Sequence, residues 1–470
     1  MADKDRFEED EDPLRPHDRS EEELRRFREM LRTNGRDINS PEALEEIIQF
    51  YFEHEQFEDA LSYCERLLSF EPFSSDAWQR KGMILNNLYK YTEALSCYEK
   101  AMSLNPTDPE ILVNCGITLD NLNRTDEAMA SFDAAIEIDR SNEDALFHKG
   151  VTLEKLERFK EALLVFKSIL TLNPDHCDAW YELGYCHDYL DNLAESIRCY
   201  DEHLNRDPFN YNAWYNRGIV LNRQGEYKKS IESYELALAI RDDFPSAWYN
   251  MGNAFANLEK LSDAIRCYKK TLDFEQDDVP AWHNLGNAYE ELHEYQQAIV
   301  AFTNAVKHDP RHYESFFGRG CCWDALDQPK KALNDYKKAL SISPDYAELW
   351  YARADAEYNL GRVEECLDSY GKVVQLDPKN AEAWFDLGDT MLERGLVVEA
   401  LEAIDRSIGL DAGFGLAHFS RGKALLLQGH RKDAVDSFRK AFELDGELRT
   451  DFKNQFPDLA SSRLYARLLK

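Results

Sequence analysis

The sequence predicts an all-α fold, a solenoid built from one short helical hairpin that recurs along the chain. A 34-residue unit occurs twelve times between residues 41 and 448 with no insertion or deletion, and apolar residues recur at helical spacing in each unit. A strict period of this length is typical of stacked repeats. Such a chain offers a long binding surface and leaves little length for a separate catalytic domain.

The twelve units carry equivalent residues at equivalent places once the period is phased. Seven of the eight tryptophans fall at repeat position 4, and ten units have glycine at position 8. Position 20 is always Ala, Ser or Cys, position 24 is aromatic in ten units, and position 32 is proline in seven. The units begin at Pro41, Ser75, Pro109, Glu143, Cys177, Tyr211, Pro245, Val279, Tyr313, Ala347, Ala381 and Gly415.

Each unit is expected to form two helices. Positions 4, 7, 8 and 11 share one face of a first helix, and positions 17, 20, 24 and 27 share a face of a second. Glycine at position 8 lets the two backbones approach closely, with the aromatic residue of position 24 beside them. Proline at position 32 is expected to end the second helix, because it lacks an N–H and clashes with the preceding turn. One hairpin cannot bury its apolar face alone, so neighbouring hairpins must stack into a continuous core.

The two ends of the chain differ from the repeats. Residues 1–19 are charged, include two prolines and lack an apolar run, so a disordered acidic tail is expected. A capping box at Ser20–Glu23 begins a predicted N-terminal capping helix within 20–40. Apolar residues from Phe452 onward predict a C-terminal capping helix within 449–470. A docking or self-association surface at either end is the alternative to simple capping.

The repeat residues resemble the tetratricopeptide repeat, or TPR, in which a Trp-Leu-Gly-Tyr-Ala-Phe-Ala-Pro pattern recurs with the same spacing. The resemblance extends over residues 41–448. It implies a TPR alpha-solenoid, a right-handed superhelix of twelve helix-turn-helix repeats. In TPR proteins the first helices line a concave groove in which extended peptides bind.

Charge and cysteine usage limit the classes of partner. The net charge is −33, from 56 Lys and Arg against 89 Asp and Glu. Nucleic acid and anionic membranes attract basic surfaces, so neither is an expected partner, whereas basic protein segments would be steered toward this chain. No segment resembles a signal peptide or a membrane span. The ten cysteines show no disulfide-like spacing, which favours a cytoplasmic location.

Signatures of catalysis are absent from the sequence. It contains no phosphate-binding glycine loop, no zinc-type cysteine pairs and no nucleophile elbow. We therefore expect no enzyme activity, no catalytic residue, no metal and no cofactor. The metal-like run Asp175–Asp178 is better explained by the start of a helix, where acids and capping residues are favoured. The adjacent Cys321 and Cys322 are expected to serve packing.

Asparagines mark three central repeats on the face that points away from the core. This face comprises positions 2, 5, 6, 9, 12 and 13 of the first helix. Position 2 is acidic in eight units but neutral in units six to eight, which carry Asn216, Asn250 and Asn284 at position 6. Asn253 and Asn287 add a second row at position 9. Because an amide both donates and accepts, such a row can hold a peptide backbone without reading its side chains. The row resembles the asparagine ladder of the TPR arrays in O-linked N-acetylglucosamine transferases; family consensus is the alternative explanation.

Aromatic residues at position 5 belong to the same face. They include Tyr215 and Tyr249, which could stack on a ligand, while packing between neighbouring first helices is the alternative. The predicted peptide-binding residues are Asn216, Asn250, Asn253, Asn284, Asn287, Tyr215 and Tyr249.

These observations predict a non-catalytic adaptor or scaffold for protein–protein interaction. It would bind an extended or basic segment of one or more partner proteins in the groove. The alternative is a structural assembly subunit that acts through its ends or its convex surface with no groove ligand. The sequence leaves the identity of the partner and the oligomeric state open.

Overall fold

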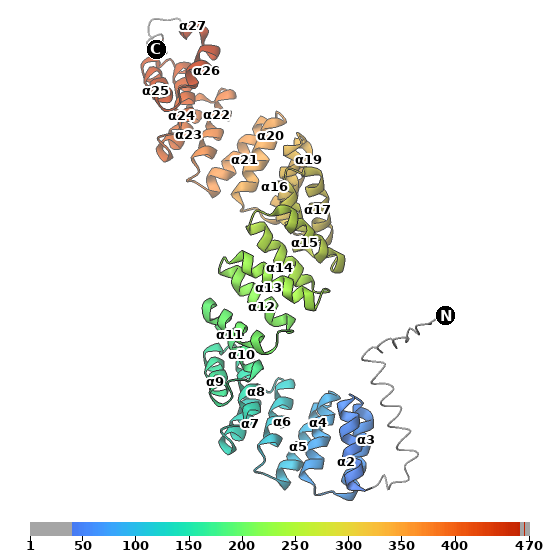
Figure 1. Cartoon of the computed structure of the whole chain (residues 1–470). Helices are drawn as coiled ribbons and strands as arrows, with labels where there is room; N and C mark the ends of the chain where they lie inside the picture. The colour runs from blue at the N-terminus through green and yellow to red at the C-terminus, as the bar shows by residue number, and fades with distance from the viewer. Residues whose placement is uncertain (1–39, 461–464, 466–470) are drawn as a thin grey trace, which may run out of the picture. The chain divides into compact units, whose positions relative to one another are not determined.

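The computed structural model of the chain describes residues 40–460 and Tyr465 (Figure 1). This part of the chain contains 26 helices, α2 to α27, and no strand. The all-α repeat fold predicted from the period is therefore confirmed. The predicted tail at 1–19 and, apart from Ser40, the predicted capping helix at 20–40 lie outside the described residues.

The helices form two compact units, residues 1–224 and 225–470, each of which contains several of the 34-residue repeats. In both units, helices of 13 and 14 residues alternate. The first unit contains α2 (Pro41–Glu53), α3 (Phe57–Phe70), α4 (Ser75–Asn87), α5 (Tyr91–Leu104), α6 (Pro109–Asn121), α7 (Thr125–Ile138), α8 (Glu143–Lys155), α9 (Phe159–Leu172), α10 (Cys177–Tyr189), α11 (Leu193–Arg206) and α12 (Tyr211–Arg223).

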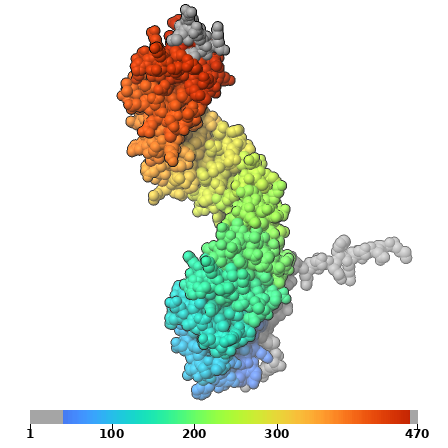
Figure 2. Space-filling view, turned by 90° about the vertical axis from the view of Figure 1, so that its left-hand side faces the viewer, coloured from blue at the N-terminus to red at the C-terminus, as the bar shows by residue number. Residues whose placement is uncertain are grey.

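The second unit continues the alternation and ends with two shorter helices. It contains α13 (Tyr227–Ile240), α14 (Pro245–Asn257), α15 (Leu261–Phe274), α16 (Val279–Glu291), α17 (Tyr295–His308), α18 (Tyr313–Ala325), α19 (Pro329–Ile342), α20 (Ala347–Asn359), α21 (Val363–Leu376), α22 (Ala381–Glu393), α23 (Val397–Leu410), α24 (Gly415–Leu427), α25 (Arg431–Leu444), α26 (Leu448–Gln455) and α27 (Pro457–Ala460). Within each unit, a first helix packs most extensively on the second helix of its own repeat. In the space-filling view, consecutive repeats of a unit lie directly against one another (Figure 2).

The first helices start where the sequence phasing starts the repeats, at position 1. The residue before each start is the N-cap. Ser40 and Ser74 accept a hydrogen bond from the backbone N–H three residues later at 3.2 Å, and Asn142 does so at 2.7 Å. Each cap satisfies a backbone donor that has no partner inside the helix, a contribution of about 1 kcal/mol.

The end of the second helix does not depend on proline, contrary to the expectation from position 32. All second helices from α3 to α25 end at position 30, whether position 32 is Pro174, Arg140 or Ala412. At position 31, Asp139 and Asp411 accept hydrogen bonds from the backbone N–H two residues later, at 2.9 and 2.8 Å. This Asx turn supplies an alternative to continuing the helix where proline is absent. Helices α13 and α15 end at the same position with neither feature, since their position 31 is Arg241 and Glu275.

The tryptophans of position 4 stabilise the same turn. In seven repeats the indole N–H donates to the backbone carbonyl of position 32 just before the helix, at 2.7–3.1 Å. The rings are consequently half-buried. Position 3, which the face prediction omitted, is the fully buried one, as in Ala145, Ala179 and Ala213. Trp78, Trp180, Trp350 and Trp384 nevertheless pack against the core, so the predicted face is confirmed for these residues, with position 4 at its edge because the indole reaches the turn.

The predicted contact between glycine and the aromatic residue is confirmed. A Cβ atom added to Gly82 would lie 2.5 Å from the ring of Tyr98, and one added to Gly286 would lie 2.6 Å from Phe302. Such distances are too short for carbon atoms, so only glycine permits this packing. Positions 20, 24 and 27 of the second helices form the buried layer, as predicted, whereas position 17 is half-buried, as in Phe57, or exposed, as in Arg431.

The cysteines and the C-terminal residues extend this core. All ten cysteines are free, and eight are buried; burial raises the pKa of the Cys64 and Cys267 thiols to about 12. At the C-terminus, Phe452 of α26 is buried against Phe438, with ring centroids 4.8 Å apart, and against Tyr465 at 5.5 Å. Among the helices described, none combines the length and apolar character needed to cross a bilayer.

Candidate peptide-binding faces

The surface that could bind a ligand is the first-helix face, defined in each unit by positions 2, 5, 6, 9, 12 and 13 of the first helices. In the first unit, position 2 carries five exposed carboxylates, in the first turn of α2, α4, α6, α8 and α10. A carboxylate in the first turn is favoured by the helix dipole, and exposure leaves it open to a basic partner. The five are Glu42, Asp76, Glu110, Asp144 and Asp178.

The predicted asparagines are half-buried and take part in contacts between neighbouring first helices. In the first unit, the Asn216 amide donates to the Tyr181 hydroxyl at 2.8 Å. In the second unit, the Asn284 amide donates to the Tyr249 hydroxyl and to the Asn253 carbonyl oxygen, both at 3.0 Å. The bonds to tyrosine join position 6 of one repeat to position 5 of the repeat before it, and the bond to Asn253 joins position 6 to position 9.

The second row of asparagines is also hydrogen-bonded. The Tyr268 hydroxyl donates to the Asn253 carbonyl oxygen at 2.8 Å. Asn287 lies 3.1 Å from Nε2 of His283, whose Nδ1 lies 3.0 Å from the Ser315 hydroxyl. Burial, with His312 nearby, lowers the pKa of His283 to about 4, so its ring is neutral at pH 7.

Tyr215 and Asn250 lie on α12 and α14, at positions 5 and 6 of the face. Both side chains are half-buried, and both interact with other residues. The seven predicted residues therefore share one kind of surface position, with Tyr215 and Asn216 in the first unit and the other five in the second. An asparagine amide carries two N–H groups and one carbonyl oxygen, so a single hydrogen bond leaves capacity for a ligand.

The aromatic residues of position 5 pack on the second helix of their own repeat. Ring centroids lie 5.7 Å apart for Tyr181 and Tyr200, and 6.0 Å apart for Tyr249 and Tyr268. The same position-5 to position-24 contact occurs at Phe147, Phe317, Tyr351 and Phe419. The structure therefore assigns these rings a packing role inside each repeat, in addition to the hydroxyl contacts between repeats.

Two carboxyl groups of the face in the first unit are held in a partly buried pair. The Cys186 thiol donates to Glu154 at 3.0 Å, and Glu182 of α10 lies beside the same carboxyl group. Burial raises the pKa of Glu154 to about 7 and that of Glu182 to about 8. These acids therefore attract a cation less strongly at pH 7 than the exposed row at position 2.

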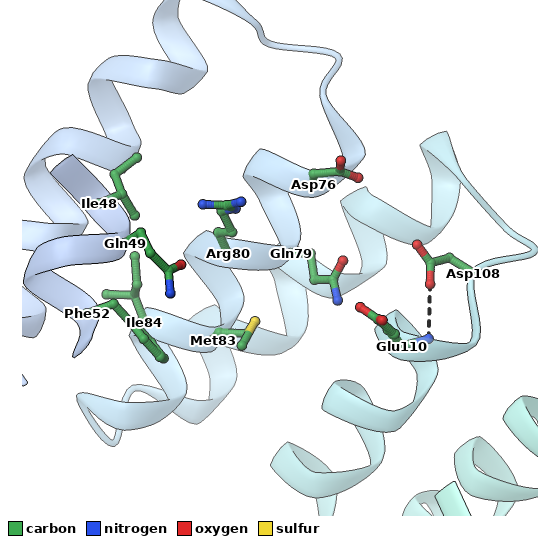
Figure 3. Close-up of a pocket in the computed structure, with 10 residues that line it drawn as sticks. All are labelled: Ile48, Gln49, Phe52, Asp76, Gln79, Arg80, Met83, Ile84, Asp108 and Glu110. Carbon is green, nitrogen blue, oxygen red and sulfur yellow. Dashed lines mark hydrogen bonds between the residues drawn. The ribbon is translucent and has the colours of Figure 1, made fainter. Parts of the chain in front are cut away.

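A pocket over α2, α4 and α6 was missed by the sequence reasoning (Figure 3). Its volume is about 480 Å³, and Gln79 and Arg80 of α4 lie at its centre. The signal was present in the sequence: position 5, aromatic in most later repeats, is Gln79 in the second repeat and Val113 in the third. The shorter side chains leave space that a ring would occupy.

The metal-like run at the start of α10 has a structural role. His176 is the N-cap and accepts from the Ala179 N–H at 3.1 Å, and Asp175 forms an ion pair with Arg206 at 3.2 Å. Cys177 Sγ lies 3.2 Å from Nδ1 of His203. Over residues 40–460 and Tyr465, no group of three His, Cys, Asp or Glu side chains is placed to hold a metal ion.

Family models of the tetratricopeptide repeat match the chain between residues 88 and 395. The matched segments are 88–149, 143–176, 178–210, 220–259, 245–278, 279–312, 327–361 and 354–395. The chain belongs to the tetratricopeptide repeat family. TPR chains serve as scaffolds for interactions between proteins, and this coarse role applies here.

Solved TPR structures are similar to parts or most of this chain. YrrB, described as a TPR protein with an unusual peptide-binding site, is 24% identical, covering 40% of this chain and 96% of its own, with a TM-score of 0.37. A TPR protein of Cytophaga hutchinsonii is 20% identical over 50% of this chain and 97% of its own, with a TM-score of 0.45. The Cut9–Hcn1 complex of the APC/C matches at 13% identity over 91% of this chain and 95% of its own, with a TM-score of 0.39. No curated protein sequence matches the chain.

Proposed function

We propose that this TPR chain is a non-catalytic adaptor that binds extended or basic segments of other proteins on its first-helix faces. The observation that carries the proposal is the row of five exposed carboxylates at position 2 of the first unit. The net charge of −33 adds long-range attraction for basic segments. The ten free cysteines fit a reducing compartment, and we place this activity in the cytoplasm.

The proposed contact residues at the centre of the chain are the asparagines and their tyrosine neighbours. Asn216 and Tyr215 would contact the partner from α12, and Asn250, Asn253, Asn284, Asn287 and Tyr249 would do so from α14 and α16. Each hydrogen bond to a peptide contributes about 1 kcal/mol, so several repeats must act together. Amides already bonded to tyrosines are held in place and lose less freedom on binding.

Capture of partners from native extract tests this proposal. The variant Asn216→Ala/Asn250→Ala/Asn284→Ala is compared with wild type, and Asn334→Ala on the exposed surface of α19 is the matched control. We expect the triple variant, at unchanged helicity, to lose at least one partner that the control retains. Retention of every partner would place recognition elsewhere.

Ionic strength tests the electrostatic part separately. Exposed charges are screened within about 8 Å at physiological salt, so capture of a basic segment should weaken as salt rises. Binding that does not change between low and physiological ionic strength would rule out a role for the position-2 carboxylates.

A structural assembly subunit is the second candidate, and one observation favours it. The ends of several second helices expose apolar side chains at position 30; Phe70 is 52% exposed and Leu172 is 49% exposed. Similar residues in the second unit are Phe274, Leu376, Leu410 and Leu444. Exposed apolar rows can bind a second copy of a chain. Sedimentation at increasing concentration distinguishes the candidates, since only assembly raises the mass without a partner.

A further inference from the structure

The pocket over α2, α4 and α6 combines three kinds of lining. Ile48, Phe52, Met83 and Ile84 form an apolar side, and Figure 3 shows them grouped on α2 and the C-terminal half of α4. Carboxyl groups of Asp76, Asp108 and Glu110 line the opposite side. Gln79 and Arg80 lie between the two sides.

Position 5 distinguishes this pocket from the face of later repeats. In α10 and α14, Tyr181 and Tyr249 occupy this position and bond to the next first helix. In α4 the same position is Gln79, whose side chain points into the space between α4 and α6 (Figure 3). Another hollow, over α22 and α24, forms beside Leu392 and Leu426, so what sets this pocket apart is its polar centre.

Gln79 itself indicates a ligand. The residue is only 8% exposed, its amide makes no hydrogen bond with the described residues, and the amide opens into the pocket rather than being sealed from solvent. An amide at the wall of a pocket with no protein partner is free to bond a ligand. An amide that both donates and accepts matches the N–H and C=O groups of a peptide bond.

Arg80 adds a second unused group. It makes no ion pair or hydrogen bond with any described residue, although it is half-buried and lines the pocket. At the next position, Lys81 is paired with Glu65 at 2.9 Å, as Arg217 and Arg319 are with Asp201 and Asp335 at 2.7 Å in later repeats, so Arg80 at position 6 is the cation that remains unpaired among the described residues. The unpaired guanidinium of Arg80 is available to a carbonyl or carboxylate oxygen of a ligand.

The charge around the pocket decides the class of ligand. Asp76 and Glu110 are exposed, and Asp108 accepts from the Glu110 backbone N–H at 3.0 Å. The adjoining hollow adds Glu45, Glu46 and Glu53. Six carboxylates against one guanidinium favour a cationic side chain, while the apolar side favours a Leu, Ile, Met or Phe.

We propose that this pocket binds a partner segment with a basic side chain beside an apolar one; the proposal rests on the proposed function, since Asp76 and Glu110 belong to its carboxylate row, and it adds a site that does not include the asparagines. The apolar side chain lies against Phe52 and Met83, and the basic one lies near Asp76 and Glu110. Gln79 bonds the peptide group between them, and Arg80 bonds a neighbouring carbonyl.

A designed peptide tests the proposal on the full chain. The probe is a short fluorescent peptide, blocked at both ends, with Leu-Arg-Leu-Lys in a Gly/Ser background. We expect binding that weakens about tenfold or more when both leucines become serine or when Arg and Lys become glutamate. Equal binding of all three peptides would overturn the proposal.

Variants of the pocket locate the binding. Gln79→Tyr fills the pocket and should abolish binding, and Asp76→Asn/Glu110→Gln should weaken it about tenfold at low salt while keeping the fold. Asp126→Asn/Glu137→Gln is the matched control, with the same charge change at exposed positions of the second helix α7, away from the first-helix face, and should bind as wild type. Undiminished binding by both pocket variants at wild-type thermal stability would overturn the proposal.

Two further variants test whether the probe binds at the asparagine face instead and whether a segment of the chain itself occupies the pocket. Asn216→Ala/Asn250→Ala/Asn284→Ala should bind the probe as tightly as wild type, so the two sites succeed or fail independently.

Residues 24–32 of the chain itself, Leu-Arg-Arg-Phe-Arg-Glu-Met-Leu-Arg, also combine basic and apolar side chains. Tighter probe binding by Arg25→Glu/Arg26→Glu/Arg28→Glu would show that this segment occupies the pocket, which would overturn the assignment to a partner.

Discussion

The face over α2, α4 and α6 and the face over α14 and α16 are built on the same 34-residue repeat and differ most clearly at positions 5 and 6. In the second region, Tyr249 at position 5 accepts a hydrogen bond from Asn284 at position 6 of the next repeat. In the first region, position 5 is Gln79, which has no hydrogen-bond partner in the described part of the chain, and it lines a pocket of about 480 Å³. Side chains on the face thus change its chemistry from repeat to repeat, while the helical hairpin stays the same.

Substitution of the position-8 glycine should destabilise the helical hairpin equally in both regions. Gly82→Ala and Gly286→Ala each place a Cβ against the ring of Tyr98 or Phe302, at 2.5 and 2.6 Å. We expect each variant to lose about 2 kcal/mol in free energy of unfolding, because the buried ring must move. Urea titration measures the loss. A much smaller loss at Gly82 would show that the helical hairpin itself is looser beside the pocket.

The free energy of unfolding should depend on pH, because position 6 of α10 is the partly buried acid Glu182. Burial raises the pKa of Glu154 to about 7 and of Glu182 to about 8, above their unfolded values near 4.5. Between pH 4.5 and pH 8 the folded state therefore binds more protons than the unfolded state. The free energy of unfolding is highest below pH 4.5 and decreases as the pH rises to 8. After discounting for partial exposure, we expect a loss on the order of 2 kcal/mol for wild type.

The variant Glu182→Gln provides the control for that pH effect. Its neutral amide removes one of the two raised pKa values, so urea titrations at pH 5 and pH 8 should differ less for the variant than for wild type. Parallel pH profiles for the two proteins would contradict the burial of this pair.

Removal of the central amide should cost more stability in the second region than in the first. Asn284→Ala removes hydrogen bonds to Tyr249 and Asn253 and should cost about 1 kcal/mol in free energy of unfolding. Gln79→Ala removes no hydrogen bond in the described structure and should cost less than half as much. Equal losses would mean that Gln79 is as well satisfied as Asn284, and the contrast between the regions would disappear.

A gain of stability below about 1 kcal/mol should come from placing a ring at position 5 of the first region. Gln79→Tyr places a ring at position 5, and Asn114 stands 35 residues on, as Asn216 does from Tyr181. The new contact and the filled space should raise the free energy of unfolding by about 0.5–1 kcal/mol. The double variant Gln79→Tyr/Asn114→Ala should lose part of this gain. Thermal unfolding compares the three proteins.

The sequence by itself determined the period, the start of every first helix and the glycine–aromatic contact. These features are local, because helical spacing and a residue's size dictate which side chains share a face and how closely two helices of one hairpin approach. For the same reason the burial of positions 20, 24 and 27 could be predicted from a single repeat.

Only the tertiary structure decided which groups meet between repeats. The tryptophans turn toward the preceding turn, an Asx turn ends some of the helices that lack proline, and Asn216 bonds to Tyr181 in the previous repeat. The pocket beside Gln79 likewise depends on what three separate helices leave unfilled. A helical pattern shows which residues point out of a helix, whereas the partner that reaches each of them comes from another helix and is set by packing.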